Sequence, residues 1–116
     1  YVFVDHVQRL AYMGGVEGAT NVLTKIASNL AQIAKELNIG VIMISHVNDD
    51  GHAKYAKSLE EEAIMLIKIE RDKESTDEEI SNTTQFFVTK NRPFSKLGYA
   101  GSVYYEPRTT IISEVR

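Results

Sequence analysis

The sequence predicts an α/β fold in which two parallel strands joined by a crossover helix are followed by antiparallel strands. The first observation is an apolar run, residues 1–5, that ends in an acid. The second is a periodic apolar stripe that starts at Leu23 and stops before Gly40. The third is another apolar run, residues 41–45, directly after the stripe. A strand, a helix and a strand in this order favour a right-handed crossover and a parallel pair.

The first element, residues 1–5, reads Tyr-Val-Phe-Val-Asp. It predicts a strand that is buried on both faces, because parallel strands of α/β proteins are covered on both sides. Residues 6–18 carry Gly14, Gly15 and Gly18 and therefore predict a loop.

The helix is predicted by apolar residues that recur at steps of three and four. They are Leu23, Ile26, Leu30, Ile33 and Leu37. This spacing places them on one helix face. Thr20 or Asn21 is the expected N-cap, and Asn38 with Gly40 is expected to end the helix.

The remaining residues predict short antiparallel strands between polar segments. Residues 47–57 predict a loop, and Ser-Leu-Glu-Glu at 58–61 predicts a helical turn. Residues 71–82 predict a solvated loop, and residues 91–98, with their proline and glycine, predict a turn. The strands are expected at residues 64–69, 83–90, 103–105 and 109–115, the last two as a hairpin.

Composition excludes several classes of protein. The 116 residues suit one domain or part of one, and the lack of cysteine excludes a disulfide framework and a thiolate zinc site. A net charge of −3 gives no bulk attraction to nucleic acid, so such binding requires local basic clusters. The apolar runs are too short to span a bilayer, so we expect no membrane partner. Because the chain opens inside a strand pattern at Tyr1, we expect a fragment of a longer protein.

Polar residues follow both predicted parallel strands. Asp5 ends the first strand, and in a nucleotide-hydrolysing fold such an acid holds Mg²⁺, usually through water; the alternative is an N-cap or turn acid. Ser45 and His46 end the second strand, so we expect them beside Asp5 at one edge of the sheet, with Asp5 and Ser45 as residues that bind the nucleotide cofactor. His46 can there bond a phosphate or orient the attacking water. The alternative is a histidine held by local loop contacts.

Lys90 and Arg92 form a second candidate site after the fourth strand. Residues two apart in an extended segment point the same way, so both cations can reach one anion. A guanidinium offered by a neighbouring subunit stabilises charge on a transferring phosphoryl group. The alternative is two surface cations in a turn.

Two sets of cations and aromatics are candidate contacts to single-stranded DNA. Lys54 and Lys57 flank Tyr55, and this arrangement suits phosphate contacts with base stacking. Arg9 and Tyr12 form the other set. An ordinary exposed loop is the alternative.

The order of these motifs resembles the hexameric replicative helicases of the bacteriophage primase-helicase, mitochondrial Twinkle and DnaB group. The segments are Tyr-Val-Phe-Val-Asp-His-Val-Gln, an amphipathic helix, Gly-Val-Ile-Met-Ile-Ser-His-Val-Asn and Lys-Asn-Arg-Pro-Phe. The likeness covers nearly the whole chain and is nearest to the phage and mitochondrial branch, in which a histidine ends the third motif. It implies that residues 1–116 are the C-terminal half of a RecA-like P-loop NTPase core.

The resemblance also implies roles for matching residues. Asp5 matches the Walker B acid that organises Mg²⁺, and His46 matches the sensor of the γ-phosphate of ATP or another NTP. Arg92 matches the arginine finger given to the next subunit, with Lys90 as its partner. The implied assembly is a hexameric ring of identical subunits on single-stranded DNA, in the cytoplasm and of bacterial or phage rather than mitochondrial origin.

The sequence departs from the family where the phosphates would be held. No Gly-x-x-x-x-Gly-Lys-Ser/Thr loop is present, and the family's catalytic glutamate lies upstream of the Walker B strand. Relatives often place a glycine in the turn that here reads Pro93-Phe94-Ser95-Lys96. We therefore expect a missing N-terminal half as partner, and a chain that is inactive alone.

Two other functions remain open. One is half of a RecA- or RadA-type recombinase ATPase, against which the combination of His46 with Lys90 and Arg92 argues. The other is a non-catalytic module for single-stranded DNA binding or ring interaction, against which the net charge of −3 argues.

Overall fold

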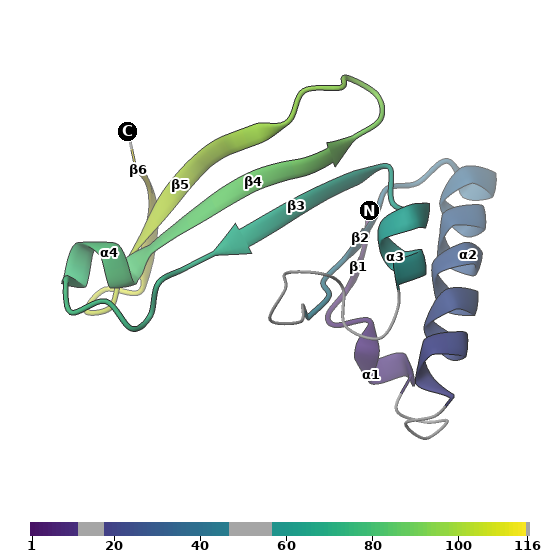
Figure 1. The fold of residues 1–116 in the computed structure, drawn as a ribbon, viewed down its shortest axis with the longest axis horizontal. Helices are drawn as coiled ribbons and strands as arrows, with labels where there is room; N and C mark the ends of the chain where they lie inside the picture. The colour runs from purple at the N-terminus through teal and green to yellow at the C-terminus, as the bar shows by residue number, and fades with distance from the viewer. Residues whose placement is uncertain (12–17, 47–56, 116) are drawn as a thin grey trace. The chain divides into compact units, whose positions relative to one another are not determined.

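The computed structural model describes residues 1–11, 18–46 and 57–115, which form two compact units (Figure 1). The first unit, Tyr1–Ala63, contains helices and a two-stranded parallel sheet, and the second, Ile64–Arg116, contains a four-stranded antiparallel sheet. The predicted α/β class, with a parallel pair followed by antiparallel strands, is confirmed. Among the described residues, no helix is both long and apolar enough to cross a membrane.

The parallel sheet of the first unit consists of β1 (Val2–Val4) and β2 (Val41–Met43). Val2 pairs with Val41, and Val4 pairs with Met43. The connection between the strands contains α1 (Gln8–Ala11) and the long helix α2 (Ala19–Leu37). Residues 6–18 were expected to form a loop, and α1 is a correction to that prediction. The three glycines that predicted the loop all follow α1 in sequence. They therefore indicate that a helix cannot extend far beyond residue 11, and they do not argue against a helix at residues 8–11.

Only one face of the parallel pair is covered by the rest of this unit. Val4 and Met43 pack against the helical core, whereas Phe3 is 69% exposed and Ile42 is 43% exposed. Phe3 and Ile42 are register partners and alternate with the inward-facing residues, so they share the opposite face. Within this unit, the prediction of a buried strand at residues 1–5 is therefore wrong for the face that carries Phe3.

Helix α2 begins earlier and ends where the sequence predicts. Gly18 occupies the N-cap position and makes no side-chain capping bond, so the expected cap at Thr20 or Asn21 is wrong: both residues lie inside the helix. At the other end, Asn38 adopts the left-handed conformation, with φ 50° and ψ 49°. Asparagine tolerates this conformation better than most residues, and it ends the helix.

The apolar core of the first unit lies where α1, α2 and the short helix α3 (Lys57–Glu62) meet. Its buried members are Val7, Ala11, Leu23, Ala27 and Leu59. Figure 1 shows α3 beside α2, and the Thr24 and Ser58 hydroxyls are 3.0 Å apart and hydrogen-bonded. The helical turn predicted at 58–61 is confirmed. The stripe of α2 is only partly covered, since Leu37 is 65% exposed.

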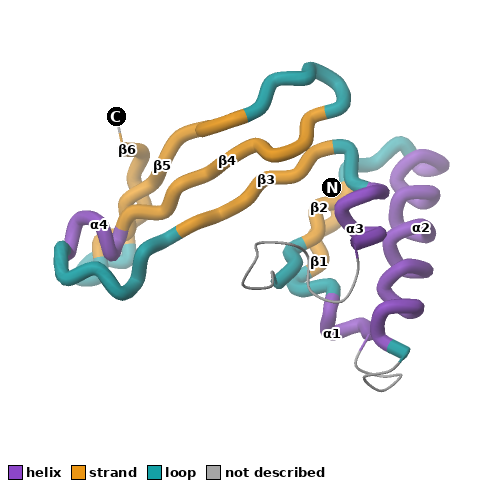
Figure 2. Tube along the Cα trace, viewed as in Figure 1, coloured by secondary structure: helices purple, strands orange, loops and turns teal. Residues whose placement is uncertain are grey.

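The second unit is an antiparallel sheet in the order β3-β4-β5-β6 (Figure 2). Its strands are β3 (Met65–Glu70), β4 (Thr83–Asn91), β5 (Gly98–Glu106) and β6 (Ile111–Val115). β5 begins five residues before the predicted 103. Gly98 and Gly101 have φ of 113° and 120°, and the β4–β5 register shifts at Phe86/Phe87. Gly98, which was expected in a turn, therefore begins the strand, and Gly101 lies at the irregularity in the pairing.

Residues 71–82 were predicted to be a solvated loop, and this prediction is wrong at its end, where α4 (Glu78–Asn82) forms. The Asp77 carboxylate accepts hydrogen bonds from the backbone N–H groups of Glu79, at 2.8 Å, and Ile80, at 3.3 Å. Such an N-cap satisfies otherwise unpaired donors of the first turn. The guanidinium of Arg71 donates to the Asn82 side-chain oxygen at 2.9 Å, which secures the other end.

Candidate functional site

The first candidate site is the carboxyl edge of the parallel pair. Asp5 follows the last residue of β1, and Ser45 and His46 follow β2 closely. Because the strands are parallel and Val4 pairs with Met43, these residues lie at the same edge. Two backbone bonds continue the pairing beyond the strands: Ile44 N–H donates to the Val4 carbonyl, and Val7 N–H donates to the Ile44 carbonyl, both at 2.9 Å.

The side chain of Gln8 joins the two halves of this edge. Its Nε2 donates to Ser45 Oγ at 2.7 Å and to the His46 carbonyl oxygen at 3.2 Å. Its Oε1 accepts from the His46 backbone N–H at 3.2 Å. Gln8 is only 1% exposed, whereas His46 is exposed and Ser45 half-buried, so these bonds are partly shielded from water. They fix the backbone at His46 relative to α1.

The two histidines of the edge touch. The rings of His6 and His46 meet edge to face, with centroids 4.2 Å apart and planes at 83°. His6 follows Asp5 directly, through a cis peptide bond. The ring of His46 therefore contacts the segment that carries Asp5, while Asp5 itself is exposed to solvent.

Ser45 is engaged within the protein. Its hydroxyl accepts from Gln8 and donates to the His46 carbonyl oxygen at 3.2 Å. A hydroxyl has one hydrogen to donate, so Ser45 in this arrangement has none left for a phosphate oxygen. The geometry gives Ser45 a part in supporting His46.

The residues of the edge suit Mg²⁺ in one respect. Among the described residues, no group of three or more His, Cys, Asp or Glu side chains is placed to enclose a metal. Mg²⁺ typically keeps several waters and binds through one or two carboxylates together with substrate phosphates. The single exposed carboxylate of Asp5 fits that mode of binding, in which most ligands come from water and nucleotide.

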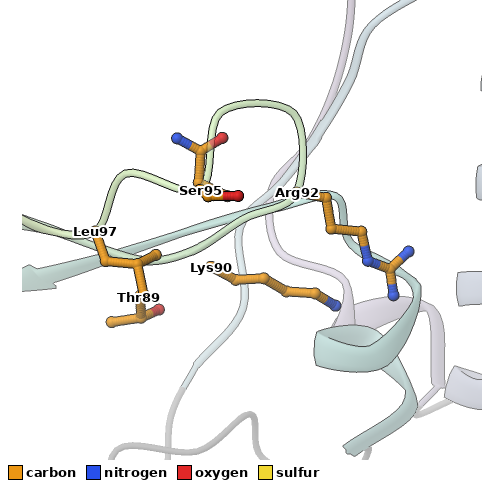
Figure 3. A pocket seen from close by; sticks show the side chains of 6 residues that line it. Thr89, Lys90, Arg92, Ser95 and Leu97 are labelled. Carbon is orange, nitrogen blue, oxygen red and sulfur yellow. The ribbon is translucent and has the colours of Figure 1, made fainter.

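The second candidate site lies in the second unit, at the end of β4. A depression of about 300 Å³ is lined by Thr89, Lys90, Asn91, Arg92, Ser95 and Leu97. Figure 3 shows the side chains of Lys90 and Arg92 extending in the same general direction in this view. The backbone at Arg92 is fixed, since its N–H donates to the Ile64 carbonyl at 3.0 Å. Lys90 is partly buried, and Arg92 is exposed.

The turn after Arg92 has a defined conformation without a glycine. Ser95 takes a left-handed backbone with φ 53°, and its N–H donates to the Asn91 carbonyl at 2.8 Å. The Asn91 side-chain nitrogen donates to the Lys96 carbonyl at 3.1 Å. Glycine adopts the left-handed conformation more readily than other residues, so a glycine would fit the backbone at position 95.

The candidate DNA contacts are only partly described. Arg9 lies exposed on α1, and Lys57 lies exposed at the first residue of α3. Tyr12, Lys54 and Tyr55 lie outside the described residues. Both described cations belong to the first unit.

Sequence reasoning assigned no site role to His6 or Gln8. Their position was the one feature that could have indicated a role, because His6 and Gln8 lie within three residues after Asp5, where the first strand ends. A fully buried glutamine must find hydrogen-bond partners, but the sequence did not show that Gln8 would be buried. No protein-family model matches this sequence, and a search of curated proteins finds no relative.

Proposed function

We propose that the chain is the C-terminal half of a RecA-like P-loop NTPase core in the motor of a hexameric replicative DNA helicase. The observation that carries this proposal is the parallel pairing of β1 with β2, which puts Asp5 and His46 at one edge. Open α/β sheets bind ligands outside the carboxyl ends of their strands. The order of motifs along the chain supports the helicase family, and the N-terminal half of the core supplies the phosphate-binding loop.

In this proposal the first unit faces the nucleotide. Asp5 holds Mg²⁺ through water, and bound Mg²⁺ neutralises charge on the phosphate oxygens. His46 donates a hydrogen bond to the γ-phosphate or orients the attacking water. His6 and Gln8 support His46 through the ring contact and the backbone bonds described above.

The cations of the second unit act on the nucleotide of the neighbouring subunit. Arg92 stabilises charge that develops on the transferring phosphoryl group, and Lys90 assists it. The hydrogen bond from Arg92 N–H to Ile64 fixes the root of this side chain. Arg9 and Lys57 contact phosphates of single-stranded DNA, so that hydrolysis moves the ring along the strand and unwinds the duplex.

The first test is Arg92→Ala in the full-length protein. We expect DNA-stimulated ATP hydrolysis to fall by about 10³-fold or more, as for other arginine fingers, while nucleotide binding persists. Arg108→Ala is the matched control, because Arg108 is also exposed and lies in the β5–β6 turn. Full hydrolysis by Arg92→Ala would refute the finger assignment.

A mixing experiment tests whether Arg92 acts between subunits. Asp5→Asn and Arg92→Ala proteins are each expected to be inactive, but a mixed ring contains interfaces with an intact Asp5 on one side and an intact Arg92 on the other. Random one-to-one mixing of a head-to-tail ring makes about a quarter of the interfaces intact. Recovered ATP hydrolysis supports action in trans, and no recovery contradicts it. Strand exchange without unwinding by the wild type would instead favour a recombinase.

A further inference from the structure

Gln8 is the most deeply buried polar side chain at the nucleotide edge, with 1% exposure. Its hydrogen bonds reach residues that lie 37 and 38 positions away in the sequence. The backbone near Gln8 is also held in place, because Val7 and Ala11 belong to the apolar core. Gln8 therefore links α1 to the end of β2.

The orientation of the Gln8 carboxamide follows from its partners. The His46 carbonyl can only accept a hydrogen bond, and the His46 backbone N–H can only donate one. The amide satisfies both at once, with Nε2 toward the carbonyl and Oε1 toward the N–H. Reversing the amide would oppose like groups at both positions.

These bonds resist any separate movement of His46. A buried polar group that loses its partner incurs the cost of its desolvation. Displacing the His46 backbone from Gln8 removes the bond to Gln8 Oε1 and one of the two bonds of Nε2, and it removes the Gln8 partners of the His46 peptide groups. The two segments are therefore expected to move together.

We infer that Gln8 is a positioning residue that fixes His46 at the nucleotide edge and transmits its displacement to α1. The inference rests on the proposed function of the edge. α1 also carries Arg9, which is exposed and follows Gln8 directly. A change in the contact between His46 and phosphate thus moves a helix that bears a candidate DNA contact. Gln8 touches neither nucleotide nor DNA in this role.

The test is a double-mutant cycle on DNA-stimulated ATP hydrolysis by the full-length protein. Gln8→Met keeps a similar side-chain volume but removes all three hydrogen bonds. We expect it to lower kcat by about tenfold or more with KM for ATP changed less than about twofold, which is the pattern of an effect on the chemical step. In the His46→Ala background, Gln8→Met should cause little further loss, because Gln8 acts through His46.

The cycle has a matched control and a second variant. Gln32→Met removes an exposed glutamine of α2 that bonds only to Glu36 in the described contacts, and it should leave kcat unchanged. Gln8→Glu keeps the acceptor for the His46 N–H but places a buried carboxylate oxygen against the His46 carbonyl oxygen, so we expect a loss at least as large as with Gln8→Met. Ser45→Ala, which removes only the bond from Gln8 Nε2 to the Ser45 hydroxyl and the bond from that hydroxyl to the His46 carbonyl, serves if Gln8→Met does not fold, and we expect a smaller loss from it.

The outcomes separate the inference from the proposed function. If the wild type hydrolyses ATP but the effects of Gln8→Met and His46→Ala multiply, Gln8 acts independently and the positioning role is overturned. An unchanged kcat in Gln8→Met and Gln8→Glu also overturns it. If the wild type shows no DNA-stimulated hydrolysis, the proposed function fails first, and the inference falls with it.

Discussion

The two compact units bury different kinds of side chain. In the first, the buried core is apolar and comes from α1, α2, α3 and the residue before α1. In the second, the buried residues among those described are the polar Asn82 and Ser102, while Ile67 and Ile69 are 53% and 64% exposed. The first unit therefore has an apolar core of its own. The second is held together mainly by backbone hydrogen bonds between strands, and its apolar side chains are exposed unless another surface packs on them.

The largest loss of stability is expected from a substitution in the apolar core of the first unit. Leu23 is fully buried, so Leu23→Ala should lower the free energy of unfolding by about 2–5 kcal/mol through lost burial and a cavity. Leu37→Ala in the same helix is the control: at 65% exposure, it should cost no more than about 0.5 kcal/mol beyond helix-propensity effects. Denaturant unfolding measures the free energy of unfolding of both variants.

Hydrogen exchange adds a test of independence. Leu23→Ala should speed amide exchange in α2 and leave β4 and β5 unchanged, because the contacts of Leu23 lie in the first unit. Equal acceleration in both units would show that they share one cooperative core, and the comparison above would be wrong.

A smaller effect is expected in the second unit, where local polar bonds replace an apolar core. Asp77→Ala should cost about 1 kcal/mol, the usual value for a lost N-cap, because Asp77 caps α4 through two backbone N–H groups. Asp77→Asn keeps a capping oxygen and should cost less. Thermal unfolding and exchange of the α4 amides measure the effect; equal losses in both variants would point to the charge of Asp77 and not to its capping bonds.

The smallest effect on stability is expected at the exposed apolar residues of the sheet. In the chain of residues 1–116, Ile69→Thr should change the free energy of unfolding by less than about 0.5 kcal/mol and reduce self-association in sedimentation velocity. Ile80→Thr is the control, since Ile80 is 51% exposed but lies in α4. If the wild-type chain stays monodisperse, or if Ile69→Thr leaves its association unchanged, the exposed apolar side chains of the sheet do not drive self-association.

The same contrast explains which parts of the fold the sequence predicted. The α2 stripe and the parallel pair depend on local periodicity and element order, and both were identified. The capped turn at Asp77 was missed because a charged segment of this kind also suits a solvated loop. β5 was predicted too short because Gly98 was interpreted as part of a turn, whereas Gly98 and Gly101 both adopt positive φ inside a paired strand. The exposure of Phe3 depends on how many layers cover the sheet, which its own sequence does not encode.

Some residues of the candidate site could be predicted from the sequence, and others could not. Asp5 and His46 were identified because strand ends are visible in sequence, and parallel pairing then brings them to one edge. Gln8 was not, because its partners lie across the whole crossover and leave no periodic pattern near residue 8. Side chains that act through tertiary hydrogen bonds are therefore harder to predict than those at the ends of strands.

The long sequence separation between Gln8 and its hydrogen-bond partners affects the order of folding. A contact between residues 37 or 38 positions apart requires closure of the intervening segment, and that loss of chain entropy is recovered only when the far end docks. Helix α2 can form early from local interactions, but the amide of Gln8 meets its partners only after β2 has paired with β1. We therefore expect the carboxyl edge of the parallel pair to form late in folding, after β2 has paired with β1.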